Sequence, residues 1–275
     1  MNKKPDLSLF ADLKDKDLKN SGICIGEGGF VIRRMMEAGL EILTVLGTED
    51  QIAKLPELSS RIAPMVIMTK EEISRVAGFN FHRGIIAAAS RPEMPDLSSL
   101  LALSPSPPMI VVLPHTSEAD NVGAIMRSAA AFGIDHIVLG DKCADPFSRK
   151  AIRASMAACF TRTVSVIRDE EEAASLLRKA GYGIVTMEVC PSRGRRFPAW
   201  NYPFPEKCAL VAGHEAEGVN ETWRNASEKA LFIPIETAVD SLNVSVASGI
   251  VFYEYYRRKG LKASASTIGL DGDGG

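Results

Sequence analysis

The 275-residue sequence lacks the features that mark secreted, membrane and metal-binding proteins. No window approaches the ~20 consecutive apolar residues of a membrane helix, and the charged N-terminus has no apolar core typical of a signal peptide. The five cysteines are odd in number and form no CxxC pair, which argues against a disulfide framework or a zinc site. We therefore expect a cytoplasmic protein with reduced thiols, no bound metal and no membrane contact.

Neither sign of charge is in excess. The chain has 32 basic and 34 acidic residues, which gives a net charge of −2. Proteins that hold nucleic acid through bulk charge are usually basic, so any nucleic-acid contact here must use local basic patches. Hydrophobic residues make up 46% of the chain, as in ordinary globular proteins, which excludes a disordered or collagen-like chain.

Motifs of several common enzyme classes are also missing. The sequence has no GxxxxGK[ST] loop of a nucleoside triphosphatase, no GxSxG of a serine hydrolase and no HExxH. Gly26-Glu27-Gly28-Gly29 only partly matches a dinucleotide-binding loop, and we interpret it as a turn before a helix. These absences weaken the hypothesis of a small-molecule α/β enzyme.

A proline- and serine-rich segment divides the chain. Residues 92–108 contain five prolines and four serines, which predicts a linker, with a short helical turn, between an N-terminal domain (1–91) and a C-terminal domain (109–260). The Gly- and Ser-rich residues 261–275 are predicted to be a disordered tail.

Both domains are predicted to be α/β. In the C-terminal domain, apolar runs alternate with helices, which indicates a largely parallel sheet covered on both faces. The smaller N-terminal domain shows the same alternation. The predicted strands cover 42–47, 63–68, 84–90, 109–113, 136–140, 163–167, 183–189, 208–213 and 230–235, and the predicted helices cover 30–39, 69–78, 121–132, 148–158, 170–180, 220–229 and 243–259.

Three polar segments follow predicted strands of the C-terminal domain, where ligands bind in such sheets. Taken singly, each has an ordinary interpretation: a surface arginine, an acidic turn and a helix cap. The segments are NVGAIMRSA with Asn121 and Arg127, GHEAEG with Glu215, and SLNVSVA with Ser241 and Asn243.

Together, and in this order, the three segments resemble the motifs of the SpoU (TrmH) family of RNA 2′-O-ribose methyltransferases, within the SPOUT superfamily. The resemblance covers most of the chain and includes Glu27-Gly28 and His82-Arg83-Gly84 in the N-terminal domain. It departs from the family at His214, where small or amide residues are common.

The resemblance implies a fold, a cofactor and a reaction. The C-terminal domain would form a deep trefoil knot that holds S-adenosylmethionine, and the N-terminal domain would bind RNA. The reaction would transfer a methyl group to a ribose 2′-hydroxyl of ribosomal or transfer RNA. Catalytic roles would fall on Asn121, Arg127, Glu215, Ser241 and Asn243, and cofactor contacts on Gly213, Ile233, Ile235 and Leu242.

The resemblance also implies a homodimer formed through the C-terminal domain, for which the stripe Val246, Ile250 and Tyr253 on the last helix is suited. A guanidinium is a poor base, so we interpret Arg127 as a clamp on an RNA phosphate that also stabilises developing oxyanion charge. Candidate RNA contacts are Arg149, Lys150, Arg153, Arg193, Arg195 and Arg196.

An alternative function is a non-catalytic RNA-binding or ribosome-assembly protein that keeps the fold. Such a protein would have no physical need for all five polar residues that the three segments carry.

Overall fold

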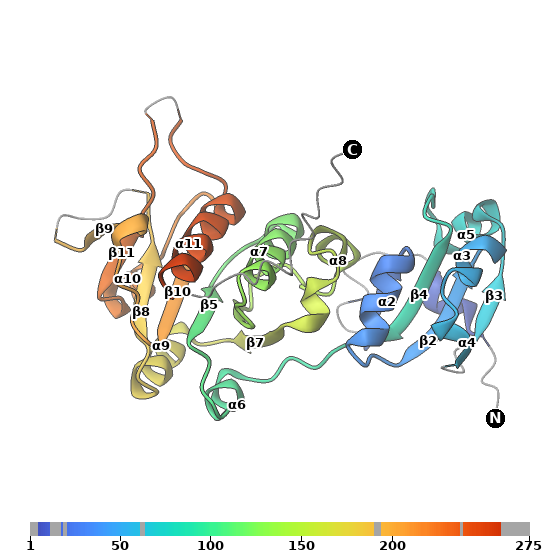
Figure 1. Cartoon of the computed structure of the whole chain (residues 1–275), viewed down its shortest axis with the longest axis horizontal. Helices are drawn as coiled ribbons and strands as arrows, with labels where there is room; N and C mark the ends of the chain where they lie inside the picture. Colours follow the sequence, from blue (N-terminus) through green and yellow to red (C-terminus); the bar gives the residue numbers. More distant parts are fainter. Residues whose placement is uncertain are drawn as a thin grey trace, which may run out of the picture.

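The computed structural model describes residues 5–11, 18, 21–60, 64–189, 194–236 and 239–259. Two β-sheets lie toward opposite ends of an elongated molecule, with helices α7 (Ala119–Ala131) and α8 (Arg149–Ala154) between them (Figure 1). No helix in this described part is long and apolar enough to cross a membrane. The predicted tail, 261–275, lies outside the described residues.

The N-terminal sheet has the strand order β1-β4-β2-β3, in which β4 runs antiparallel to β1 and β2, and β3 runs parallel to β2. Its strands are β1 (Ile23–Glu27), β2 (Ile42–Gly47), β3 (Met65–Ile67) and β4 (Ile85–Ser90). Its helices are η1 (Leu7–Phe10), α2 (Gly29–Glu37), α3 (Glu49–Ala53), α4 (Glu57–Ser60) and α5 (Lys70–Ala77).

Local sequence explains where these helices begin and which face they bury. Helix α5 starts at a capping box, in which the Thr69 hydroxyl accepts from the Glu72 backbone N–H and the Glu72 carboxylate accepts from the Thr69 N–H. Helix α2 begins at Gly29, directly after its N-cap Gly28, and buries the stripe Val31, Ile32, Met35 and Met36. The turn predicted over 26–29 is therefore shorter, because Gly26 and Glu27 belong to β1.

The C-terminal sheet has the order β7-β6-β5-β10-β8-β11-β9, and every neighbouring pair is parallel. The predicted α/β fold with a largely parallel sheet is therefore confirmed. The central strands β5 and β10 are buried along their whole length, as expected for strands covered on both faces. The strands are β5 (Met109–Leu113), β6 (His136–Gly140), β7 (Thr163–Ile167), β8 (Gly183–Met187), β9 (Arg196–Pro198), β10 (Cys208–Ala212) and β11 (Lys229–Phe232).

Five further helical segments connect or cover these strands: η2 (Ala158–Thr161), α9 (Glu170–Lys179), η3 (Ala199–Asn201), α10 (Glu221–Ala226) and α11 (Val244–Arg258). The segment between the sheets contains the predicted helical turn, α6 (Leu97–Leu101), which begins at the cap Asp96. Helix α7 packs closely on α8 because Gly123 has no side chain. An ideal Cβ at this position would lie 2.6 Å from the Ala151 carbonyl oxygen and would collide with it.

Three predicted boundaries are wrong by three or four residues. The helix predicted over 148–158 ends at Ala154, because Met156 and Ala157 have φ values of 50° and 63°, which a right-handed helix cannot contain. The helix predicted over 220–229 ends at Ala226, since β11 starts at Lys229. The strand predicted over 230–235 ends at Phe232, shortly before Pro234, which has no N–H to donate to a neighbouring strand.

Two ion pairs with little exposure join the sheets. Arg149 of α8 pairs with Glu27 of β1 at 2.6 Å, and its guanidinium lies 3.9 Å from the centroid of the Phe79 ring. Arg91 donates to Asp145 at 2.9 Å. Because one cluster of buried apolar side chains also includes residues of both sheets, the N-terminal sheet is fixed against α8. The division into separate domains stays a prediction.

Candidate active site

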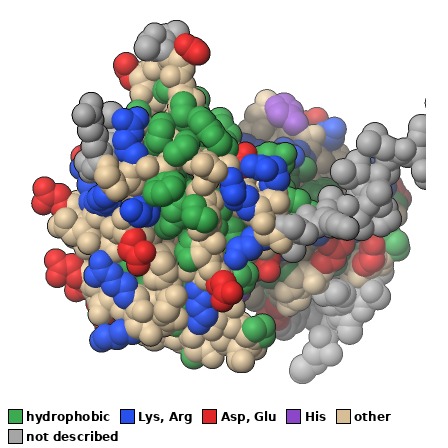
Figure 2. Space-filling view, turned by 60° about the vertical axis from the view of Figure 1, so that its left-hand side comes forward, with side chains coloured by type: hydrophobic (Ala, Val, Ile, Leu, Met, Phe, Trp, Pro, Cys, Tyr) green, Lys and Arg blue, Asp and Glu red, His purple; other side chains and the backbone are tan. Residues whose placement is uncertain are grey.

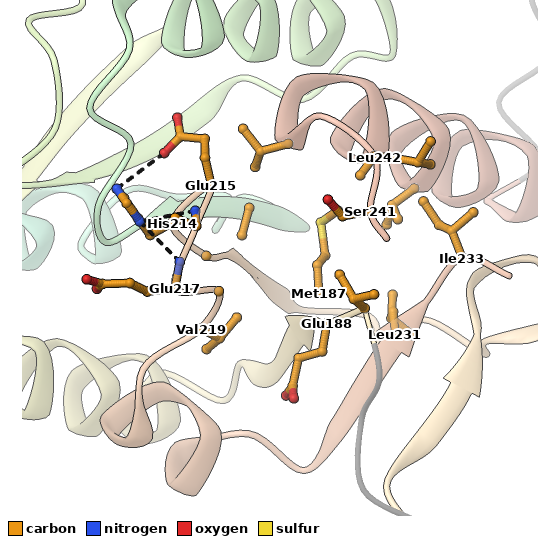
Figure 3. A pocket seen from close by; sticks show the side chains of 18 of the residues that line it. Met187, Glu188, His214, Glu215, Glu217, Val219, Leu231, Ile233, Ser241 and Leu242 are labelled. Atoms are coloured by element: carbon orange, nitrogen blue, oxygen red, sulfur yellow. Dashed lines mark hydrogen bonds and ion pairs between the residues drawn. The ribbon is translucent and has the colours of Figure 1, made fainter. Parts of the chain in front are cut away.

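A pocket of about 420 Å³ lies at the carboxyl ends of β8, β10 and β11 (Figure 3). Its walls come from the segment after β8, the loop between β10 and α10, the loop between β11 and α11, and the first turns of α11. Its volume is within the range of about 300–1,000 Å³ that is usual for small-molecule sites. All four predicted cofactor-binding residues line it: Gly213, Ile233, Ile235 and Leu242.

Gly213 sits where the pocket wall folds back on itself. The backbone of His214 exchanges two hydrogen bonds with that of Gly218, both 2.9 Å long. An ideal Cβ at position 213 would lie 2.3 Å from the Gly218 carbonyl carbon and 2.4 Å from the Val219 nitrogen. The loop therefore has its shape only because residue 213 has no side chain.

A chain of hydrogen bonds links three of the predicted catalytic residues. The Asn243 amide Nδ2 donates to Asn121 Oδ1 at 3.0 Å, and Asn121 Nδ2 donates to Glu215 Oε1 at 2.9 Å. Asn243 is also the N-cap of α11, because its Oδ1 accepts from the Ser245 and Val246 backbone N–H groups. The three side chains come from different strand exits and hold one another in place.

The other two predicted catalytic residues lie differently. Ser241 is exposed and lines the same pocket as Glu215. Arg127 is exposed on α7, does not line this pocket, and has no hydrogen-bond or ion-pair partner among the described residues. Thus Glu215 and Ser241 line the pocket, whereas Asn121 and Asn243 are joined to Glu215 by hydrogen bonds. Among the described residues, nothing pairs with the Arg127 guanidinium.

A histidine pair at the edge of the site is absent from the sequence predictions. The rings of His115 and His214 stack with centroids 4.2 Å apart. His214 Nδ1 accepts from the Ala216 and Glu217 backbone N–H groups at 3.3 Å each, and its Nε2 lies 3.6 Å from Glu215 Oε2 (Figure 3). Only the position of each histidine, shortly after a predicted strand, could have indicated the pair. The two strands, β5 and β10, are neighbours in the sheet.

The same pair belongs to a group of possible metal donors. In the part of the chain that the structure describes, His115, His214 and Glu217 are the one group whose ligand atoms all lie within 4.8 Å of one another. His214 is poorly suited as a ligand, because a neutral imidazole whose Nδ1 accepts two N–H bonds carries its hydrogen on Nε2. The arrangement fits a hydrogen-bonded loop better than metal coordination.

The described cysteines are free, as predicted, and all four are buried. Cys190 lies outside the described residues. Cys143 lies at the end of β5, where its thiol donates to the Leu113 carbonyl at 3.0 Å. Burial raises the pKa of the Cys143 thiol to about 11 and those of Cys24, Cys159 and Cys208 to about 12. None of these thiols is therefore poised as a nucleophile near neutral pH.

The candidate RNA-binding residues have unequal surroundings. Arg153 and Arg196 are exposed, and Lys150 is half exposed but within 3.2 Å of Asp120. Arg195 donates to the Ser227 hydroxyl, and Arg193 lies outside the described residues. Arg149 is engaged with Glu27 between the two sheets, so it is not part of the RNA surface that we propose below.

Comparison with known proteins agrees with this architecture. The family described as SpoU rRNA Methylase matches residues 108–253, which is more than half of the chain. The chain belongs to the SpoU family. The match spans the C-terminal sheet and every residue of the hydrogen-bonded chain from Asn243 to Glu215.

Curated relatives of this SpoU chain are RNA methyltransferases by name. An uncharacterised tRNA/rRNA methyltransferase of Mycobacterium tuberculosis is 29% identical over 259 residues, which are 92% of this chain and 89% of the relative. The 23S rRNA (guanosine-2′-O-)-methyltransferase RlmB of Acinetobacter baylyi is 28% identical over 81% of this chain and 91% of the relative.

Solved structures share the fold over almost the whole chain. An AdoMet-bound rRNA methyltransferase from Sinorhizobium meliloti superposes with a TM-score of 0.78 at 22% identity, covering 93% of this chain and 94% of that one. The SpoU methyltransferase AviRb from Streptomyces viridochromogenes, in complex with AdoMet, superposes with a TM-score of 0.76 at 20% identity. The match covers 92% of this chain and 96% of that one. At these identities the likeness is one of fold.

Proposed function

We propose that this protein transfers a methyl group from S-adenosylmethionine to a ribose 2′-hydroxyl of structured RNA, ribosomal or transfer. One observation carries the proposal. The pocket lined by all four predicted cofactor-binding residues is bordered by Glu215 and Ser241, and Glu215 is joined through Asn121 to Asn243. Binding site and polar site thus meet at the carboxyl ends of parallel strands.

The pocket fits this cofactor in shape and chemistry. The missing side chain at Gly213 lets the loop fold back onto Gly218 and Val219, which gives this wall of the pocket its shape. Leu231, Ile233 and Leu242 supply an apolar wall that suits adenine. Bound there, S-adenosylmethionine would supply a methyl group activated by its sulfonium.

The protein's own contribution is to position groups. Because Asn121 is held at both ends of its amide, by Glu215 and Asn243, the site is ordered before RNA arrives. The Ser241 hydroxyl, exposed in the pocket, is free to hydrogen-bond a ligand. We assign Glu215, Ser241 and Asn243 the task of holding the geometry of the site.

We assign Arg127 the task of binding a phosphate of the RNA. Its guanidinium is exposed and lacks a partner among the described residues, so it can grip a phosphate with two parallel N–H bonds. Its positive charge stabilises the oxyanion that forms as the 2′-hydroxyl loses its proton, and the neighbouring phosphate assists this deprotonation.

Further RNA contacts would come from the exposed Arg153 on α8 and Arg196 on β9, and from the N-terminal sheet. These surfaces are compatible with the nearly neutral net charge, because they are local. The trefoil knot of the C-terminal domain stays a prediction.

Methylation mapping tests the proposed function. Purified protein with methyl-labelled S-adenosylmethionine and RNA from cells lacking the gene should label RNA at a site that resists alkaline cleavage, because a 2′-O-methyl removes the attacking hydroxyl. Label confined to a base would contradict ribose specificity. Cofactor binding without any transfer to RNA would favour the non-catalytic alternative.

The last helix leaves an apolar stripe uncovered. Val246, Ile250 and Tyr253 are 52%, 38% and 49% exposed, although they share one face of α11. Figure 2 shows hydrophobic side chains gathered on the surface of the C-terminal half, with Lys and Arg side chains around them. Because the stripe is not part of the core, we propose that a second copy of the chain covers it.

Ile250→Lys should therefore convert a homodimer into a monomer. The lysine would place a charge in the proposed interface without opening a cavity in the monomer, since Ile250 is not buried. Light scattering at micromolar concentration measures the change. Ile67→Lys, at a 65% exposed isoleucine of β3, is the matched control and should stay dimeric. A monomeric wild-type protein would contradict the proposal.

A further inference from the structure

Besides Glu215 and Glu217, the carboxylate of Glu188 lines the pocket, and it has no part in the mechanism above. Glu188 follows β8, and its backbone N–H donates to the Leu231 carbonyl at 2.9 Å, which fixes its position. Its side chain is 12% exposed. Figure 3 shows it on a different side of the pocket from Glu215, with the two carboxylates turned away from each other.

The Glu188 carboxylate is fixed in position but accepts fewer hydrogen bonds from described residues than it could. The buried Thr186 hydroxyl donates to Oε1 at 2.7 Å, and it is the one described side chain that donates a hydrogen bond to this carboxylate. Arg224 Nε lies 3.5 Å from Oε2, so it balances the charge without a good hydrogen bond. A carboxylate can accept about four hydrogen bonds, and one this enclosed is stabilised by further donors.

The register between strands β8 and β10 places this carboxylate beside the loop that we assign to the cofactor. Strands β8 and β10 are parallel neighbours, and Met187 pairs with Ala212. Glu188 and Gly213 are therefore the next residues on adjacent strands, which lie about 4.8 Å apart in a sheet. A ligand that approaches the Gly213 backbone comes within reach of Glu188.

We propose that Glu188 accepts hydrogen bonds from the 2′- and 3′-hydroxyls of the cofactor's ribose, an inference that rests on the proposed function. The two hydroxyls of a nucleoside match the two oxygens of a carboxylate. An acidic side chain beside a glycine-containing strand exit makes the same contact in dinucleotide-binding folds, although their topology differs.

The charge around Glu188 favours neutral hydroxyls over the ammonium of the methionine part. Arg224 already lies beside the carboxylate as its counter-ion, so a second cation would be partly repelled. In the proposed reaction the methyl group would lie on the side of Glu215, which Asn121 and Asn243 hold in place, and this would leave the nucleoside for the Glu188 side.

Calorimetric titration of the full chain tests the assignment with three probes. These are S-adenosylhomocysteine, its 3′-deoxy analogue, and 5′-methylthioadenosine, which keeps the ribose and lacks the amino acid. Glu188→Ala should weaken both ribose-intact probes by about 10–100-fold, the scale of losing charge-assisted hydrogen bonds. The 3′-deoxy analogue keeps only one of the two hydroxyls, so it should bind the wild-type protein more weakly and lose less affinity in the variant than the ribose-intact probes do.

Two controls keep the test independent of folding. Glu188→Gln keeps the size of the side chain and should weaken binding less than Glu188→Ala, with an unchanged thermal midpoint. Glu206→Gln alters an exposed acid outside the pocket and should bind all probes within about two-fold of the wild type, because exposed acceptors are already hydrated.

Two results would overturn the assignment. A loss for S-adenosylhomocysteine alone would mean that Glu188 contacts the ammonium, and equal affinities in wild type and Glu188→Ala would mean that it contacts neither group. If the wild-type protein binds none of the three probes, the proposed function fails together with the assignment. If it binds them and only the variants behave unexpectedly, the proposed function stands and the role of Glu188 is wrong.

Discussion

Arg127→Ala should lower methyl transfer to RNA by roughly 100-fold or more, the scale of losing one donor that stabilises developing charge. The affinity for S-adenosylmethionine should stay within about three-fold, because Arg127 does not line the pocket. The thermal midpoint of the variant should equal that of the wild type. Val122, Ile125 and Met126 form the buried face of α7, whereas Arg127 is exposed, so its truncation opens no cavity.

Two further variants sharpen this test. Arg127→Lys should recover little activity, since an ammonium cannot reproduce the two-pronged contact of a guanidinium with a phosphate. Arg168→Ala, at an exposed arginine after β7, controls for the loss of one positive charge and should methylate like the wild type. A destabilised Arg127→Ala protein, or one that no longer binds cofactor, would show a structural role. Normal methylation would show that Arg127 is not needed.

The parallel sheet was predictable because its strands are sealed from water on both faces. A strand such as β5, with all five residues buried, must be an uninterrupted apolar run, and MIVVL reads as such. Since ligand loops follow the carboxyl ends of parallel strands, the polar residues after these runs were identifiable as one site. Asn121, Glu215 and Asn243 proved to be hydrogen-bonded to one another.

Features that depend on the order of strands in space were not predictable. The stacking of His115 on His214 requires β5 beside β10, although four strands separate them along the chain. The same holds for Arg149, which reads as one of a basic group but reaches Glu27 of the other sheet. Local sequence contains no sign of either partner, because each contact joins segments that only the fold brings together.

The end of one helix was predicted wrongly for a different reason. Ala157 adopts a left-handed φ of 63° without being glycine, so the sequence carries no breaker signal where the helix before it stops. The surrounding packing imposes a conformation that costs alanine roughly 1–2 kcal/mol. The capped helix starts were better defined, since Thr69 and Asn243 accept the first backbone N–H groups directly.

Gly213→Ala should have the largest effect on the cofactor pocket, with a loss of S-adenosylhomocysteine affinity of about 100-fold or more. The added methyl would lie 2.3 Å from the Gly218 carbonyl carbon and 2.5 Å from its oxygen. Both are backbone atoms held by the paired His214–Gly218 hydrogen bonds. The loop must open to accept the methyl, and overpacking of this kind typically costs about 1–3 kcal/mol, so the thermal midpoint should fall too.

Gly29→Ala separates the clash at Gly213 from the general effect of replacing glycine. At Gly29 an ideal Cβ would lie 3.7 Å from the nearest atom of Leu55, an ordinary contact, and the residue starts α2 far from the pocket. This variant should bind S-adenosylhomocysteine like the wild type, with a thermal midpoint that is unchanged or slightly higher, because alanine favours a helix more than glycine does. Wild-type affinity in Gly213→Ala would mean that the loop opens at little cost. The close approach at Gly213 would then not determine how the pocket holds its cofactor.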